Sequence, residues 1–296
     1  MNAPHFITLN NGVAMPALGF GTLDRGQLDK VQPAVETALA TGYRLIDTAA
    51  AYGNEREVGR GIAASGIARS ELFVTTELWL TEYGYEGALK GFEKSLGKLG
   101  LDYVDLYLLH WPVPTQFEAT VRAHEAAEKL LADGRVRAIG VANFSAADLD
   151  ALAARCGTVP AVNQVEIQPY FNQHALRREN ARRGIATEAW GPLGLSVRRN
   201  EDDGKLDPLQ HPVIVRLAEA SGKTPAQVLL RWHLQRGDIA IPKSVRPERI
   251  RENFSVFDFA LSDADMAAID ALDTGERSGP DPDVVDANTF PIKVDD

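Results

Sequence analysis

The hydrophobic positions of this chain form short apolar runs separated by longer stretches with helical periodicity. The apolar runs are rich in β-branched and aromatic side chains and lie close to glycines and prolines, a pattern typical of buried strands. There are eight: PALGFG (16–21), RLIDTA (44–49), LFVTTE (72–77), VDLYLLHW (104–111), RAIGVANF (137–144), AVNQVEI (161–167), IATEAW (185–190) and IAIPKS (239–244). Strands that alternate with helices predict a parallel sheet covered by those helices.

The stretches between the runs carry helical patterns and helix-start signals. Helices are predicted for VQPAVETALATG (31–42), YEGALKGFEKSLGKLG (85–100) and FEATVRAHEAAEKLLADG (117–134). Three further helix starts have capping residues: Ser145 before AADLDALA, Thr224 before Pro225, and Ser262 with Asp265. Most strands are therefore followed by one helix.

Two architectures compete for such a chain, an open doubly wound sheet and a closed barrel. The open sheet usually has G-x-G-x-x-G after its first strand, whereas residues 19–24 are GFGTLD and do not match. The barrel explains eight strands without a linker. We therefore predict a single (β/α)8 TIM-barrel domain over residues 1–296. FITLNNGVAM (6–15) should add an N-terminal β-hairpin turning at Asn11-Gly12, and the Pro- and Asp-rich tail from Thr274 a C-terminal loop over the active-site face.

Composition excludes several classes of protein. The 296 residues carry a formal net charge of −10, which argues against a nucleic-acid or membrane-surface partner. The single cysteine, Cys156, allows neither an internal disulfide nor a thiolate metal cluster. The first residues do not resemble a secretory signal, and no apolar run approaches the roughly 20 residues of a membrane span. A cytoplasmic protein is expected.

Polar residues that can take part in catalysis or ligand binding recur at the ends of the predicted strands. The active site of such a barrel lies at the carboxyl ends of its strands, and there the sequence places Asp47, Tyr52, Glu77, His110, Asn143, Gln164, Trp190, Lys243 and Ser244. One such residue would be unremarkable, but titratable groups that converge on one rim indicate catalysis. A tyrosine near a histidine can protonate a carbonyl oxygen as hydride reaches the carbon. Because a free phenol titrates near pH 10, it normally needs a nearby cation.

Other chemistries lack their signatures. No two histidines have the short spacing of a zinc site of the H-E-x-x-H kind, and no G-x-S-x-G element suggests a serine hydrolase. We expect no metal site.

Several long segments resemble those of the aldo-keto reductase superfamily. They are DTAAAYGNE (47–55), LLHWP (108–112), VNQVEIQPY (162–170), AWGPLG (189–194) and IPKSVRPERIRENFSVFDF (241–259). The resemblance covers nearly the whole chain and is greatest to bacterial members of the 2,5-diketo-gluconate reductase type. It implies a (β/α)8 barrel that reduces aldehydes and ketones with NADPH.

The resemblance also implies roles for individual residues. Tyr52 would be the general acid, His110 would orient the substrate carbonyl, and Asp47 would support the tyrosine. The cofactor would be held by Gly21, Thr22, Asn143, Gln164, Trp190, Leu193, Lys243, Ser244, Arg249 and Asn253, the last four around its adenosine end. Lysine and arginine beside a helix start also suit a 2′-phosphate on chemical grounds. A solvated basic helix is the alternative, since Arg246 and Arg251 lie alongside.

One position departs from the family in a way that affects the chemistry. Where the family has FVTTKLW in its third strand, with a catalytic lysine, this chain has Glu77. Two carboxylates about 4 Å apart repel by roughly 4 kcal/mol at an effective dielectric constant near 20, equivalent to about three pKa units. Glu77 and Asp47 should therefore not both be ionised at neutral pH. No substitute cation is evident among Arg44, Lys90, Lys94 and Lys243.

Glu77 leaves three interpretations open. It disables reduction while the cofactor still binds; or it is protonated, donates a hydrogen bond to Tyr52 or Asp47, and shifts the pH optimum to acid; or the barrel is a cofactor-binding sensor or scaffold with little turnover. Smaller departures from the family are Ala142, where a serine is common, and Leu23, where some members have an aromatic residue.

Apolar residues near the rim suggest where the substrate binds. Phe20, Leu23, Trp79 and Trp111 should line the substrate site, with Phe117 more probable as rim packing. The tail residues Val284, Val285 and Phe290 are candidates to close over it. The expected partner is a small carbonyl compound, such as a polar aldehyde, a dicarbonyl or a sugar-derived ketone, and the expected state is a monomer.

Overall fold

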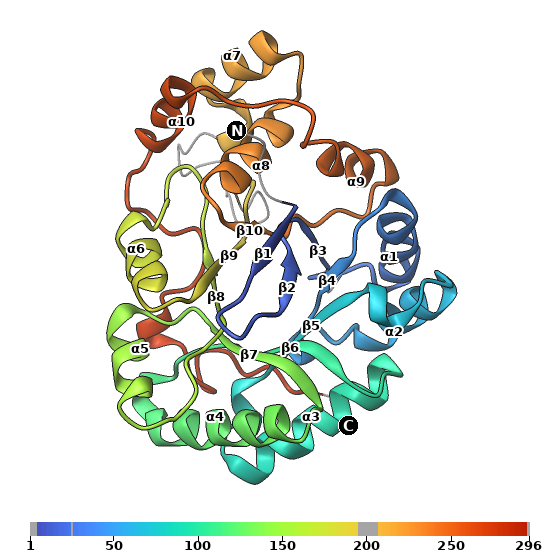
Figure 1. Cartoon of the computed structure of the whole chain (residues 1–296), viewed down its shortest axis with the longest axis vertical. Coiled ribbons are helices and arrows are strands. Elements are labelled where there is room, and N and C mark those ends of the chain that lie inside the picture. The colour runs from blue at the N-terminus through green and yellow to red at the C-terminus, as the bar shows by residue number, and fades with distance from the viewer. Residues whose placement is uncertain (1–4, 25, 195–206, 295–296) are drawn as a thin grey trace.

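Eight parallel strands surrounded by helices form the centre of the protein. A computed structural model describes residues 5–24, 26–194 and 207–294 (Figure 1). The sheet has the order β10-β9-β8-β7-β6-β5-β4-β3, and a parallel bridge between Leu18 and Ala240 joins its two edges. The strands are β3 (Gly19–Gly21), β4 (Leu45–Asp47), β5 (Phe73–Leu78), β6 (Val104–Leu109), β7 (Val136–Ala142), β8 (Val162–Glu166), β9 (Ala186–Trp190) and β10 (Ile239–Ala240). The predicted barrel is confirmed.

Helices form an outer layer around the strands (Figure 1). They are α1 (Leu28–Thr41), α2 (Glu55–Ala64), α3 (Tyr85–Leu99), α4 (Phe117–Ala132), α5 (Ala146–Ala153), α6 (His174–Arg182), α7 (Pro212–Ser221), α8 (Pro225–Gln235), α9 (Pro247–Phe254) and α10 (Asp263–Asp270). The predicted caps are confirmed, because Ser145, Thr224 and Ser262 each accept a hydrogen bond from the third backbone N–H of their helix. Among the described helices, none combines the length and apolarity that crossing a membrane requires.

The predicted N-terminal hairpin covers the amino end of the barrel. It consists of β1 (Phe6–Thr8) and β2 (Ala14–Pro16), and its turn contains Gly12 at φ +84°. Leu9 and Met15 are buried in one cluster with side chains of the barrel interior, including Leu45 and Phe73. The opposite, carboxyl end carries the predicted site residues.

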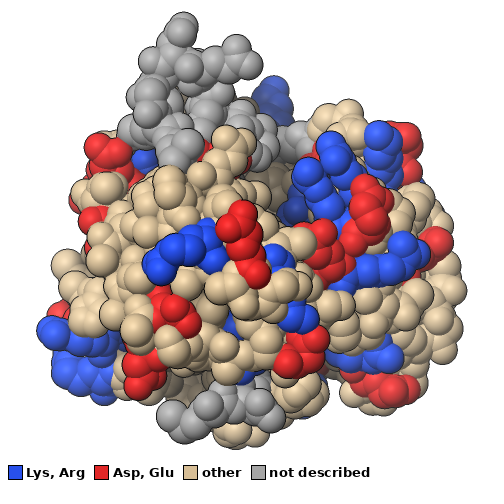
Figure 2. Space-filling model, turned by 90° about the horizontal axis from the view of Figure 1, so that it is seen from above, with Lys and Arg blue, Asp and Glu red and all other residues tan. Residues whose placement is uncertain are grey.

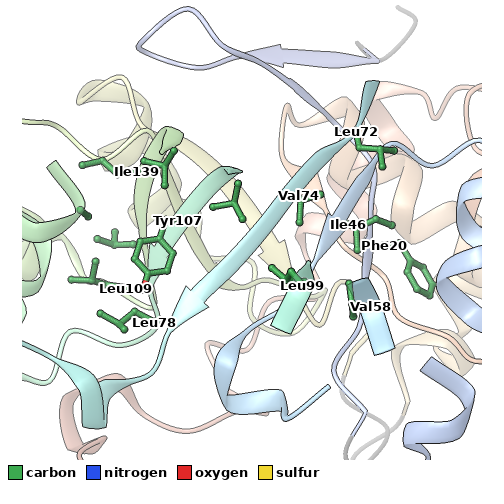
Figure 3. Close-up of a cluster of buried hydrophobic side chains, with 14 of the residues drawn as sticks. Phe20, Ile46, Val58, Leu72, Val74, Leu78, Leu99, Tyr107, Leu109 and Ile139 are labelled. Carbon is green, nitrogen blue, oxygen red and sulfur yellow. The ribbon is translucent and has the colours of Figure 1, made fainter. Parts of the chain in front are cut away.

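Alternation along the strands divides the core into two layers. Outward-facing side chains such as Ile46, Val74 and Tyr107 pack against the helices (Figure 3), whereas Leu45 and Phe73 belong to the inner cluster. Phe20 lies in the outer layer, 2% exposed and edge-on to Tyr43, so its prediction as a substrate contact is wrong. Its neighbours in β3 are Gly19 and Gly21, and alternation sends the side chain between them outward.

Some strand boundaries also differ from the prediction. The run predicted for 239–244 yields only Ile239–Ala240 as strand. Pro242 has no backbone N–H, so it cannot donate to a ladder. Likewise, Pro16 belongs to the hairpin, and β3 begins only at Gly19.

Candidate active site

Four polar residues predicted to be catalytic meet at the carboxyl end of the barrel. Asp47 is the last residue of β4, Glu77 lies near the end of β5, and His110 directly follows β6. Tyr52 ends the 3-10 turn Ala50–Tyr52, which follows β4. Parallel pairing of adjacent strands brings these ends together, although the residues are up to 63 positions apart in sequence.

Glu77 lies between the phenol and the imidazole. Tyr52 Oη donates a hydrogen bond to Glu77 Oε1 over 3.3 Å, and His110 Nδ1 lies 3.4 Å from Glu77 Oε2. The rings of Tyr52 and His110 meet edge to face, with centroids 5.9 Å apart. A carboxyl group thus contacts the tyrosine where the family resemblance implied a lysine.

The electrostatics of this cluster favour uncharged carboxyl groups. Burial raises the pKa of Glu77 well above its ordinary value, and the charge of Glu188 raises it further. Burial likewise raises the pKa of Asp47, helped by the charges of Glu188 and Glu77. Repulsion between Asp47 and Glu77 was expected from the sequence. The larger contribution of burial is a finding of the structure.

Glu188, on β9, is a third buried carboxyl group that the sequence analysis missed. Gln164 Nε2 donates to Glu188 Oε2 over 3.1 Å and to Asp47 Oδ2 over 3.0 Å, so one amide joins two acids. Burial raises the pKa of Glu188 to about 7. A signal was present in the sequence, because Glu188 precedes Trp190 by two positions and alternation turns both residues to the same face.

The basic residues considered as substitutes for the missing lysine are engaged elsewhere. Arg44 donates to the backbone carbonyls of Leu39 and Tyr43, and Lys94 pairs with Glu82 at 3.1 Å. Lys243 pairs with Asp24 at 2.5 Å, and Lys90 is exposed on α3. In the described part of the chain, no three His, Cys, Asp or Glu side chains are placed to hold a metal ion.

The residues predicted for the nicotinamide end lie together above β7, β8 and β9. Asn143 follows β7 at φ +65°, and its Nδ2 donates to the His110 carbonyl over 2.9 Å. Trp190 Nε1 donates to Asn143 Oδ1 over 2.9 Å. On the neighbouring side, Thr22 Oγ1 donates to the Asp47 carbonyl, and a Cβ at Gly21 would lie 2.9 Å from the Ile241 carbonyl. Two amides and a half-buried indole therefore share one wall of the rim.

The residues predicted for the adenosine end lie on α9 and directly before it. Lys243 and Ser244 precede this helix, Arg249 is exposed on it, and Asn253 is buried near its end. Among the described residues, no side chain caps α9, so its first backbone N–H groups remain available to an anion. Figure 2 shows Lys and Arg side chains gathered at its upper right, on the α9 side of the molecule. This set of donors fits a phosphate group. Leu193, by contrast, is half-buried and packs against the core.

Aromatic residues and the C-terminal tail cover His110. Trp79 meets the His110 ring edge-on at 5.1 Å, and Trp111 lies parallel to it at 6.0 Å. The tail is held above them: Trp79 Nε1 donates to the Ile292 carbonyl over 3.1 Å, and Phe290 stacks on Trp111 at 6.3 Å. The predicted covering loop is thus present.

The residues predicted to cover or line the site differ in how far they are buried. Val285 is buried in the same cluster as Trp79 and Trp111, as expected, whereas Val284 is 62% exposed and does not close over the site. Leu23 is 47% exposed at the rim, and Phe117 packs against the outer core, the rim-packing alternative.

A second anchor of the tail involves a buried acid at the end of β8. Glu166 accepts hydrogen bonds from the backbone N–H groups of Ser278 (2.7 Å) and Gly279 (2.9 Å). A Cβ at Gly279 would lie 2.3 Å from the ring of Trp190, so only glycine permits the tail to cross this indole so closely.

Comparison with known proteins agrees with this geometry. The model of the Aldo/keto reductase family matches residues 17–274. Morphine 6-dehydrogenase of Pseudomonas putida is 55% identical over 287 residues, which cover 96% of each chain. Glyoxal reductase of Bacillus subtilis is 47% identical over 277 residues, 94% of this chain and 96% of the relative.

A solved structure shows the same fold. The crystal structure of a Bombyx mori aldo-keto reductase in complex with NADP has a TM-score of 0.87 at 35% identity, covering 98% of this chain and 97% of that one. With eight parallel strands, a tyrosine and a histidine at their carboxyl ends and a family match over most of its length, the chain belongs to the aldo/keto reductase family of NADP(H)-dependent oxidoreductases that act on carbonyl groups.

Proposed function

We propose that this protein reduces aldehydes and ketones to alcohols, with Tyr52 as the proton donor. The observation that carries the proposal is the contact of the Tyr52 phenol with Glu77 beside His110, at the carboxyl end of the barrel and beneath two tryptophans. NADPH, when bound, supplies the hydride. The chain's own residues supply the proton, the orientation of the carbonyl and the exclusion of water.

The protein groups act through hydrogen bonds to the carbonyl oxygen and to each other. His110 orients the substrate oxygen towards Tyr52, whose hydroxyl gives up its proton as negative charge develops on that oxygen. Glu77 works in its protonated form. In the structure Tyr52 Oη donates to Glu77; as Tyr52 passes its proton to the substrate this hydrogen bond reverses, and the Glu77 carboxyl donates to Tyr52 Oη and stabilises the charge left on the phenol. Asp47 is also uncharged, and a hydrogen bond from Gln164 holds its side chain in place. The raised pKa values of Glu77 and Asp47 support this interpretation over a disabled site.

The cofactor site is proposed from the donors at the rim. Asn143 and Gln164 offer amides to the nicotinamide carboxamide, and Trp190 offers its ring face. Lys243, Ser244, Arg249 and Asn253 are assigned to the 2′-phosphate end because charge-assisted hydrogen bonds favour a phosphate there. Gly21, Thr22 and Leu193 are assigned to the wall between these two ends.

The substrate class follows from the walls of the site and from the relatives. Trp79, Trp111 and Leu23 give an apolar wall, while His110 and Tyr52 give hydrogen bonds to one oxygen. Because one relative is named a glyoxal reductase, we propose small aldehydes and dicarbonyls as substrates. A sugar-derived ketone of the diketo-gluconate type is a further candidate. We also propose that residues 1–296 form one domain that acts as a cytoplasmic, bacterial monomer.

The direct test is NADPH oxidation with a panel of small aldehydes, dicarbonyls and ketones between pH 5 and 9. The expected result is carbonyl-dependent turnover that is fastest at acid pH. Tyr52→Phe should lose it by about 100-fold or more, because general acid catalysis typically contributes that much. NADPH binding, followed by quenching of tryptophan fluorescence, should persist in the variant. NADPH affinity without carbonyl-dependent turnover at any pH would instead favour a cofactor-binding barrel that acts as a sensor or scaffold.

A further inference from the structure

Glu188 is a buried acid at the site to which the proposed function assigns no task. It lies on β9 two residues before Trp190 and is fully buried. Its Oε2 accepts a hydrogen bond from Gln164 Nε2, the same nitrogen that donates to Asp47. Its Oε1 has no hydrogen-bond partner among the described residues. A buried carboxylate with one hydrogen bond is costly, so this side chain strongly favours its neutral form.

Among the described residues, the groups that face Glu188 include no Lys or Arg to offset its charge. Across the barrel interior it interacts with Asp47 on β4 and Glu77 on β5. The neighbouring strand β8 presents the neutral amide of Gln164, and β10 pairs through the apolar residues Ile239 and Ala240. The nearest basic residue beyond β10 in sequence, Lys243, is bound to Asp24. Three acids and one amide thus form a closed group in the barrel.

The surroundings of these acids raise the pH at which they lose their protons. Burial raises the pKa of Glu188 to about 7, and burial together with the charge on Glu188 also raises the pKa values of Asp47 and Glu77 well above their ordinary range. Glu188, whose pKa lies near 7, is therefore an acid of this group that changes its charge near neutrality. Below that pH the group is neutral, and above it the group carries one negative charge inside a low-dielectric interior.

We propose that Glu188 is a positioning residue of the reductase site whose protonation state decides whether Tyr52 can act as a proton donor. Neutral Glu188 leaves the buried group of Gln164, Asp47 and Glu77 uncharged, so negative charge can develop on the phenol as it gives up its proton. Ionised Glu188 adds a like charge to the same buried group and opposes that development. This inference rests on the proposed function, since it assumes reduction with Tyr52 as the donor.

The test compares the pH profiles of the native protein and Glu188→Gln. The kcat for NADPH-dependent reduction of glyoxal and of 4-nitrobenzaldehyde is measured from pH 5 to 9. The native kcat should fall about tenfold per pH unit above pH 7, as for loss of one essential proton. Glu188→Gln cannot ionise, so its kcat should stay level to higher pH and exceed the native value at least tenfold at pH 8.5. Its KM and its NADPH affinity by fluorescence quenching should change little.

Glu166→Gln is the matched control. Glu166 is another buried acid, on β8. It holds the C-terminal tail and, among the described residues, makes no hydrogen bond or ion pair with the other three acids. Whatever its rate, this variant should keep the native fall above pH 7. A Glu188→Gln profile that falls at the same pH as the native one overturns the inference while leaving the proposed function intact.

A second measurement keeps the inference testable if Glu188→Gln does not fold. Infrared difference spectra of the native protein between pH 6 and 8 should show loss of a protonated carboxylic acid band. Absence of such a change overturns the inference. Absence of carbonyl-dependent turnover in both the native protein and the variant, despite NADPH binding, overturns the proposed function and this inference with it.

Discussion

Two regions of this barrel bury carboxyl groups and treat them in opposite ways. Asp238, just before β10, accepts a hydrogen bond from Arg177 over 2.7 Å and lies beside Arg236 and His233. Burial alone would raise the pKa of Asp238, but His233, whose Nδ1 lies 3.6 Å from Asp238 Oδ2, and the two arginine charges lower it overall. At the other region, Asp47 and Glu188 share the Gln164 amide, and Glu77 contacts Tyr52 and His110. Among the described residues, no Lys or Arg pairs with these three acids, and burial raises the pKa of each.

The difference shows that burial by itself does not decide the charge of an acid. Both regions are equally inaccessible to solvent, yet one holds a carboxylate and the other holds carboxylic acids. What differs is whether the surrounding elements bring positive charge. The lysine that the family resemblance implies at position 77 would bring positive charge to the proposed catalytic end, whereas Glu77 leaves this end a region of the second kind.

The largest expected effect comes from removing the main cation of Asp238. Arg177→Met keeps most of the side-chain volume but leaves a buried carboxylate short of its closest partner. We expect a loss of about 4 kcal/mol in the free energy of unfolding, measured by urea denaturation at pH 7. Arg182→Met, on the same helix but pairing at the surface with Glu179, should cost less than about 0.5 kcal/mol. Equal losses would show that Asp238 does not depend on its arginine.

The next effect concerns the stability of the neutral region as a function of pH. Between pH 4.5 and 7 the folded protein keeps the Glu188 proton that the unfolded chain loses, so stability should fall as pH rises through this window. For a pKa raised from 4.5 to about 7, the fall attributable to Glu188 is about 3 kcal/mol. Asp47 and Glu77, whose pKa values are also raised, should add to this fall.

Glu188→Gln provides the comparison for this prediction. In urea denaturation at a series of pH values, the variant should lose the part of the slope between pH 4.5 and 7 that Glu188 causes. A native protein whose stability is flat across this window would contradict the assignment of a neutral acid in the folded state.

A smaller effect, on kcat, is expected when a positive charge is introduced among the neutral acids. Glu77→Lys places an ammonium group between Tyr52 and the two remaining acids, where it can stabilise both the phenolate and an ionised Asp47. We expect kcat at pH 8 to rise about 100-fold, or about 2.7 kcal/mol in activation free energy, with little gain at pH 5.5.

Glu118→Lys makes the same charge change on exposed α4 and serves as the control for Glu77→Lys. It should leave the rate unchanged at both pH values. If Glu77→Lys is no faster than the native protein at pH 8, the acid is a working part of the site under alkaline conditions as well.

The sequence predicted those site residues that lie at the carboxyl ends of the strands. Asp47, Glu77 and His110 were placed at the carboxyl ends of buried runs, and the structure brings them together there. The sequence analysis failed where it had to predict which face of the sheet a strand residue points to. Phe20 was assigned to the substrate but faces the helices, and Glu188 was passed over although its alternation with Trp190 turns it inward. Whether Val284 or Val285 would be buried in the tail could not be predicted from alternation, because the tail is not a strand.

The sequence by itself determined the order of strands and helices, the helix caps, the hairpin turn and the acid at position 77, because these depend on neighbours a few residues away. Only the tertiary structure decided the charge of the site. Gln164 meets Asp47 across 117 residues, and Glu166 meets Ser278 across 112. Such contacts form when the barrel closes, and closure also removes water from the acids. Their pKa values, and with them the proton chemistry proposed for Tyr52, therefore follow from the fold as a whole.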